Sequence, residues 1–429
     1  QDKFYFLMRK KTYSEGEKKW MGAERKRGAI CDFVRLLKSG DRGDFINASD
    51  AYAKMNIKYV ITLDADTRLR HNSAAHMAGA MAHPVNMPET DEKTNIVTRG
   101  YGIMQPRIGI DIESAGKTFF TKVHTLCGGL DAYSGAASDL YQDIFGEAIF
   151  VGKGIFDADV FYRALDRRFP KEKILSHDLL EGSYLRCALL SDVTVSDSYP
   201  EKYLSYMARL HRWIRGDWQL ADRLKAHVKT ETGSEKNPLS LLSRYKIFDN
   251  LRRSVLPYVT LRLVTASLLL PAPYSYIILV FVFMTGAYNL LSEIFCAAKL
   301  RMKQKISPKF NANIIYGVKR ALTEFVLNAV LLVYESYVSA DAVIRAMYRM
   351  FISKKKLLSW VTAEETEKKA ANGYIMHYKR MWISPAFGFS LILLSPFTDG
   401  TAVSLICLIL GTAWVCAPYI ANAISTPVQ

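Results

Sequence analysis

Two aspartates that follow an apolar run are the residues whose spacing points most directly to chemistry. The run Val60–Leu63, in which Thr62 is the one polar member, leads into Asp64 and Asp66, and only Ala65 separates them. Residues i and i+2 of a strand point the same way, so the two carboxylates are expected to share a face. Like charges repel and need positive compensation. Two interpretations follow: solvated acids at a strand end, or oxygen ligands of a divalent cation with a phosphate on its far side.

The elements around these acids alternate between strand and helix. Strands are expected at 4–10, 59–66, 100–110 and 192–200, and helices at 26–40, 73–83 and, after an extended start, through 173–191. This alternation favours an α/β fold with a doubly wound, mostly parallel sheet. Ligands of such sheets bind beyond the carboxyl ends of the strands, where Asp64 and Asp66 fall. The geometry therefore favours the metal interpretation.

The composition favours a membrane protein over a soluble nucleic-acid binder. Half of the 429 residues are hydrophobic, yet the formal net charge is +16. Long apolar runs with basic flanks are typical of membrane proteins, and this charge suits an anionic membrane surface and an anionic ligand better than nucleic acid. The six cysteines have no metal-like spacing and are expected to be reduced thiols.

A change in composition divides the chain into a soluble unit, 1–245, and a membrane region, 246–429. Two transmembrane hairpins are expected at about 254–298 and 384–424, because each pairs apolar segments across a short proline-containing break. Basic flanks place the ends of both hairpins on the cytoplasmic side. Between them, a helix at about 313–350 carries charges in its apolar stretch, so spanning the membrane and lying in its interface both remain open. The chain begins with glutamine and without a signal-peptide pattern, which suggests a fragment whose soluble unit lacks its first strand.

Six sequence blocks follow one another along the chain. They are WMGAERKRG, YVITLDADTRL with MAHPVN after it, GYGIMQPRI, IFGEAIFVGKGIFD, SHDLLEG and HRWIRGDWQ, and a further similarity lies around LLSWVTAEE. In this order they resemble the glycosyltransferase domain of the bacterial cyclic β-1,2-glucan synthases, which is related to the processive cellulose and chitin synthases. The resemblance covers most of the chain. It implies a GT-A-like fold on the cytoplasmic side of the bacterial inner membrane, followed by a helical transmembrane region.

The resemblance also implies roles for the acidic residues. Asp64 and Asp66 would form a DxD motif that binds Mg²⁺ or Mn²⁺, with Asp66 as the direct ligand, and the cation would neutralise the diphosphate that leaves UDP-glucose. Asp178 would be the general base of an inverting transfer, where the alternative role is a helix N-cap. Related synthases carry an acidic residue where this chain has His177. That histidine could tune the pKa of Asp178, bind acceptor or pack.

Basic and aromatic residues complete the implied site. HRWIRGDWQ resembles the QxxRW motif, with Arg209 in place of the glutamine, and the ring of Trp213 would stack on an acceptor sugar. An amphipathic helix with Trp213 and Trp218 as interfacial anchors is a compatible alternative. For the basic stretch at 26–28, the alternative is an ordinary basic helix start. The expected donor contacts are Lys26, Arg27, Gly28, Asp64, Gln105, Arg107, Arg212 and Arg215, and the expected acceptor contacts are Trp213, His177, Gly152 and Lys153.

The expected activity is elongation of a β-1,2-glucan by transfer of glucose from UDP-glucose, with donor and linkage coming from the resemblance alone. The expected partners are the donor, a glucan acceptor, the lipid bilayer and other domains of a longer synthase, and not nucleic acid. One alternative is another processive β-glycan synthase, cellulose-like, chitin-like or for an envelope polysaccharide. The other is a non-catalytic membrane scaffold, against which the intact Asp64, Asp66, Asp178 and Trp213 argue.

Overall fold

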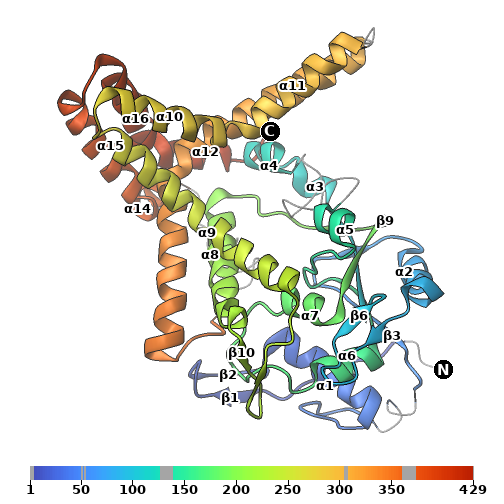
Figure 1. Cartoon of the computed structure of the whole chain (residues 1–429). Helices are drawn as coiled ribbons and strands as arrows, with labels where there is room; N and C mark the ends of the chain where they lie inside the picture. The colour runs from blue at the N-terminus through green and yellow to red at the C-terminus, as the bar shows by residue number, and fades with distance from the viewer. Residues whose placement is uncertain are drawn as a thin grey trace.

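An α/β body and an assembly of long helices make up the chain (Figure 1). A computed structural model describes residues 4–49, 52, 55–125, 139–303, 308–359 and 373–428. The main core packs α1 (Arg25–Ser39) and α6 (Ala158–Leu165) against the sheet and includes Val34, Ile103, Phe156, Phe161 and Leu180. In Figure 1 the helices after residue 240 stand beside and above this body, and α11 projects away from the rest.

The central sheet has five strands in the order β3-β8-β7-β9-β4. Their bounds are β3 Tyr59–Thr62, β4 Arg68–Leu69, β7 Ile103–Ile110, β8 Gly154–Asp157 and β9 Cys187–Asp197. The prediction of an α/β architecture is confirmed, but that of a mostly parallel sheet is wrong. Only β7 and β9 pair in parallel, whereas the pairs β3–β8, β7–β8 and β4–β9 are antiparallel. The predicted strands β3, β7 and β9 do run the same way, and the two short strands that sequence patterns missed run against them.

The connection between β3 and β4 crosses the end of the sheet, because these consecutive strands occupy its opposite edges. The six steps from Thr62 to Arg68 reach at most about 20 Å, and four strand spacings in a flat sheet would already take about 19 Å. Yet the connection contains a turn, in which the Thr67 N–H donates to the Asp64 carbonyl at 3.1 Å. The sheet must therefore curl, so that this turn bridges its two edges.

Of three predicted elements, the first agrees with the structure to within one residue at each end and the other two differ from it. The helix at 26–40 is α1, Arg25–Ser39, and Gly40 ends it with a φ of 75°. Residues 4–10 are not a strand, because their backbone bonds to a loop, and only Arg9 forms an isolated bridge, to Phe45. The helix expected through 191 is the shorter α7, Asp178–Leu185, because Arg186 turns the chain with a φ of 52° and Cys187 then starts β9.

Shorter elements complete the body. The helix predicted at 73–83 is α2, Ser73–Ala82. The remaining small elements are β1 Thr12–Ser14, β2 Lys19–Met21, β5 Glu89–Thr90, β6 Val97–Arg99, β10 His227–Lys229, β11 Ser234–Lys236, α3 Ile112–Ala115, α4 Phe119–His124, α5 Leu140–Phe145 and α6 Ala158–Leu165. The helix α8, Tyr203–Gln219, packs against α12 and so connects the body to the helical assembly.

Long helices form the second half. They are α9 Leu241–Ser267, α10 Ala272–Gly286, α11 Tyr288–Lys303, α12 Pro308–Tyr348, α14 Tyr374–Arg380, α15 Ile383–Leu394 and α16 Thr401–Ile424. Within the described part of the chain, Ile314–Ser353 and Thr401–Ile424 are long and apolar enough to cross a membrane. The pair Ala272–Gly286 and Tyr288–Lys299 would make a third span if counted together, but it bends by 65°.

Candidate active site

Ion pairs fasten the turn that carries the two aspartates to the end of the sheet. The ammonium group of Lys153, just before β8, lies 3.2 Å from Asp64 and also pairs with Asp197 at the end of β9. The side chains of Lys153 and Asp197 are only 6% and 1% exposed. Thr67 adds a hydrogen bond, donating from its hydroxyl to the Asp197 carboxylate at 3.2 Å. A buried cation therefore joins the turn to the strand beneath it.

Lys26, in the first turn of α1, is a second cation beside Asp64. Its Nζ lies 2.5 Å from Asp64 Oδ1 and donates to the carbonyl of Gly152 at 2.8 Å. Burial alone would raise the pKa of Asp64, but Lys26 and Lys153 outweigh it and hold that pKa below its ordinary value. The compensation that the paired aspartates require thus comes, for Asp64, from the protein's own lysines.

Asp66 differs from Asp64 in being exposed. Its Oδ2 accepts a hydrogen bond from the hydroxyl of Ser198 at 2.9 Å. Carboxylates are the ligands that Mg²⁺ and Mn²⁺ prefer, and they bind best where a cation can reach them from solvent. Both oxygens of Asp64 face ammonium groups. Of the two carboxylates on this turn, Asp66 is therefore the one that fits a divalent cation.

Asp178 begins α7, and His177 rather than Asp178 takes the N-cap position, without a capping hydrogen bond. The carboxylate lies against the backbone of Gly152. A Cβ at residue 152 would come within 2.7 Å and 2.9 Å of the two Asp178 carboxylate oxygens, and Gly152 also has a φ of 89°. Only glycine satisfies both conditions. Since the Gly152 carbonyl accepts from Lys26, residues 152 and 153 join the two aspartate sites.

Arg212, on α8, lies within electrostatic reach of the same aspartates. Burial lowers the pKa of Arg212 to about 10, and the charges of Arg209 and Arg215 act in the same direction, whereas Asp64 and Asp66 oppose the change. Arg212 therefore lies within the electrostatic reach of both aspartates and remains charged at neutral pH. The structure thus gathers the predicted residues Lys26, Asp64, Asp66, Gly152, Lys153, Asp178 and Arg212.

Trp213 follows on α8 and carries a cation on one face of its ring. The guanidinium carbon of Arg209 lies 4.6 Å from the ring centroid, close enough for a cation–π contact. Arg209 is the residue that replaces the glutamine of the QxxRW pattern. The neighbouring Trp218 donates from its indole to Ser254 on α9 at 2.9 Å. Acceptor contact by Trp213 stays a prediction.

Other predicted contact residues lie in packing positions. Arg215 donates to the carbonyl of Ser359 at 3.1 Å. Arg27 pairs with Glu24, and its guanidinium lies 5.6 Å from the ring centroid of Phe169. Their roles as donor contacts stay predictions.

Two further predicted residues pack closely around the site, and one lies along β7. A Cβ on Gly28 would fall 2.2 Å from the carbonyl oxygen of Ala23. Gln105 is buried and accepts from the N–H of Val151 at 2.6 Å. Arg107 lies on β7, where the register against β9 shifts. Beyond Ser359, the LLSWVTAEE block lies outside the described residues, as does Cys127.

Sequence patterns missed Asp197, Ser198 and Glu181. Asp197 is an acid at the end of a predicted strand, the same signal that singled out Asp64, and it was available in the sequence. Glu181 gave no signal of its own, because an acid in the first turn of a helix is common.

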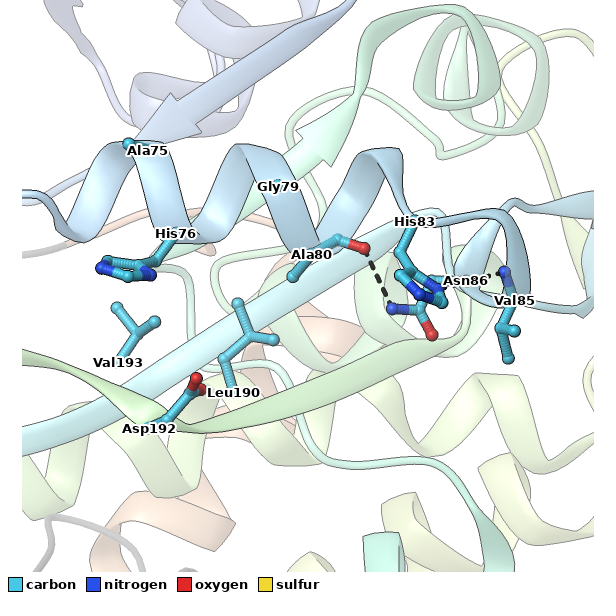
Figure 2. Close-up of a pocket in the computed structure, with 10 residues that line it drawn as sticks. All are labelled: Ala75, His76, Gly79, Ala80, His83, Val85, Asn86, Leu190, Asp192 and Val193. Atoms are coloured by element: carbon cyan, nitrogen blue, oxygen red, sulfur yellow. Dashed lines mark hydrogen bonds between the residues drawn. The ribbon is translucent and has the colours of Figure 1, made fainter.

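A separate hollow lies between α2 and β9 (Figure 2). It is lined by Ala75, His76, Gly79, Ala80, His83, Val85, Asn86, Leu190, Asp192 and Val193. On the α2 side of the hollow, the amide of Asn86 donates to the Ala80 carbonyl at 2.9 Å, as Figure 2 shows. No predicted site residue lines this hollow, so it is distinct from the candidate active site.

Comparison with known proteins identifies a relative of the chain. No protein-family model matches the chain. Cyclic β-(1,2)-glucan synthase NdvB of Rhizobium meliloti (strain 1021) is 33% identical to the chain over 432 residues. The match covers 99% of this chain and 15% of the synthase, so the chain spans a small part of that relative's length. The predicted resemblance is confirmed, and the chain is related to a cyclic β-(1,2)-glucan synthase over nearly all of its own length.

Proposed function

We propose that the chain is the glucosyltransferase part of a cyclic β-1,2-glucan synthase and elongates a β-1,2-glucan from UDP-glucose with inversion. The observation that carries this proposal is that Asp178 lies against Gly152, that the adjacent Lys153 pairs with Asp64, and that Arg212 lies within the electrostatic reach of Asp64 and Asp66. The relation to a cyclic glucan synthase supports glucan synthesis in general. The sugar donor, the linkage and the stereochemistry of the transfer do not follow from that relation and are part of the proposal.

Asp178 would act on the acceptor. Its side chain is 31% exposed and can be reached by an acceptor hydroxyl, while Gly152 fixes the position of its carboxylate. The carboxylate would take the hydroxyl proton as the oxygen attacks the anomeric carbon from the face opposite the leaving group, which is the step that inversion requires.

The other half of the site would act on the donor. Asp66 would hold the divalent cation, which when bound neutralises charge on the departing diphosphate. Arg212 would contribute a fixed positive charge beside the same phosphates. Asp64, compensated by Lys26 and Lys153, would keep the turn in place.

Membranes that contain the protein, radiolabelled UDP-glucose and Mg²⁺ or Mn²⁺ provide the test. We expect polymer that depends on the metal, that contains β-1,2 linkages and that Asp66→Ala and Asp178→Asn both reduce by at least a hundredfold. Asp166→Asn, which removes an ion pair to Arg35 at the end of α6, serves as the control and should be active. Other β linkages would favour another processive synthase. A protein that neither binds UDP-glucose nor makes polymer would be a scaffold.

A further inference from the structure

A histidine lies between two carboxylates at the start of α7. Nδ1 of His177 is 2.8 Å from Glu181 Oε1 and 3.3 Å from Asp178 Oδ1. The side chains of His177 and Glu181 are 9% and 3% exposed, compared with 31% for Asp178. Of the three, Asp178 is the one that a substrate can reach, so Glu181 can influence chemistry only through its neighbours.

The two carboxylates need a positive charge between them. Ligand atoms of His177, Asp178 and Glu181 all lie within 4.8 Å of one another. Two negative charges this close repel each other unless a positive charge compensates them. An imidazolium between them supplies the compensation, because its Nδ1–H can donate to either oxygen.

Surrounding groups favour that charged imidazole. Burial alone would lower the pKa of His177, but Glu181 and Asp178 outweigh it and raise that pKa. From α1, Arg27 opposes the change, although its guanidinium also pairs with Glu24. Cys31, also on α1, lies within the electrostatic reach of Glu181, and burial raises the pKa of its thiol to about 12, so it is neutral at pH 7.

We propose that Glu181 is a positioning residue for the base: it accepts the Nδ1–H of His177 and so holds the imidazole against Asp178 as its counter-ion. This inference rests on the proposed function and adds to it a residue that no substrate touches. In the transfer, the acceptor O–H bond breaks and its proton goes to Asp178. The oxygen's electron pair forms the new bond to the anomeric carbon, and the pair of the breaking C–O bond leaves with the diphosphate. His177 and Glu181 neither gain nor lose a proton in this step.

Glu181→Gln tests the inference, because it removes the charge and preserves the size of the side chain. An opposite charge at this distance changes a pKa by about 1–3 units, so losing it lowers the pKa of His177. We expect the alkaline limb of kcat/KM to move to lower pH by about 1 unit or more, with little change in KM for UDP-glucose. Glu181→Asp, which keeps the negative charge, should bring the alkaline limb part of the way back to its parental pH. Ser183→Ala, which removes a hydroxyl bonded to the Leu179 carbonyl on the same helix, is the control and should keep the parental profile.

The outcomes separate this inference from the proposed function. Lower activity with an unmoved pH profile would overturn it and leave Glu181 a structural residue. If Glu181→Gln does not fold, His177→Gln replaces it in the test. An alkaline limb that stays at its original pH in His177→Gln would also overturn the inference. If the parent protein itself makes no glucan, the proposed function fails. An NMR titration of His177 then still tests the inference. If Glu181→Gln leaves the pKa of His177 unchanged, the contact between Glu181 and His177 is excluded.

Discussion

Gly152 is the residue on which the geometry of the candidate site depends most. Its carbonyl accepts from Lys26, its missing side chain makes room for Asp178, and Lys153 beside it pairs with Asp64. A substitution here therefore acts on the base without altering any charge.

Gly152→Ala should lower the rate of glucan synthesis by about a hundredfold, which is the effect of misplacing a reacting group by about 1 Å. The added methyl would overlap the Asp178 carboxylate, and a φ of 89° is unfavourable for alanine. Initial rates over a range of UDP-glucose concentrations would show a fall in kcat with KM changed much less. Gly79→Ala on α2, where nothing lies within 4 Å of an added Cβ, is the matched control. Equal activity in the two variants would contradict the geometry.

At the scale of elements, local patterns were sufficient where local forces dominate. The run Val60–Leu63 predicts β3, and the glycine after a periodic apolar face predicts the end of α1. The short strands β4 and β8 were missed, because their places in the sheet are fixed by pairing with strands distant in the sequence. The bridge from Lys153 to Asp64 and Asp197 was missed for the same reason, since it joins residues from three separate parts of the chain.

Lys153→Met should destabilise the protein by about 3–5 kcal/mol, because it leaves the buried Asp197 carboxylate without a compensating positive charge. Thermal unfolding in detergent would measure the change. The exposed pair of Lys117 and Glu201, at 2.6 Å, offers the comparison. Lys117→Met should lower the free energy of unfolding by about 1 kcal/mol or less. A similar loss in both variants would mean that burial does not make the Lys153–Asp197 pair more important for stability.

For the whole molecule, the α/β body and the helices are held together by specific contacts as well as by apolar packing. Lys246 on α9 is buried and lies 3.0 Å from the carboxylate of Glu147 in the segment that leads to Gly152. Gln219 on α8 donates to the Leu357 carbonyl at 2.9 Å. The helices therefore contact the same segments that position the candidate site.

Cys416 gives a direct test of membrane insertion. It lies within α16, Thr401–Ile424, and is exposed on the protein surface. If α16 spans a bilayer, lipid should shield Cys416 from a membrane-impermeant maleimide until detergent is added. A cysteine introduced at the exposed Lys93 should react in inside-out vesicles without detergent. Labelling of Cys416 in intact vesicles at the rate of that control would contradict a spanning α16.

The turn between β3 and β4 limits how the chain can vary in length. It reaches from one edge of the curled sheet to the other and is held on the way by Lys26, Lys153 and Ser198. An extra residue between Leu63 and Arg68 would either slide β4 by one position against β9, which turns its side chains to the opposite face, or lift the aspartates away from Lys153. The length of the segment that carries Asp64 and Asp66 is thus matched to the width of the sheet, and an insertion in this segment should be poorly tolerated.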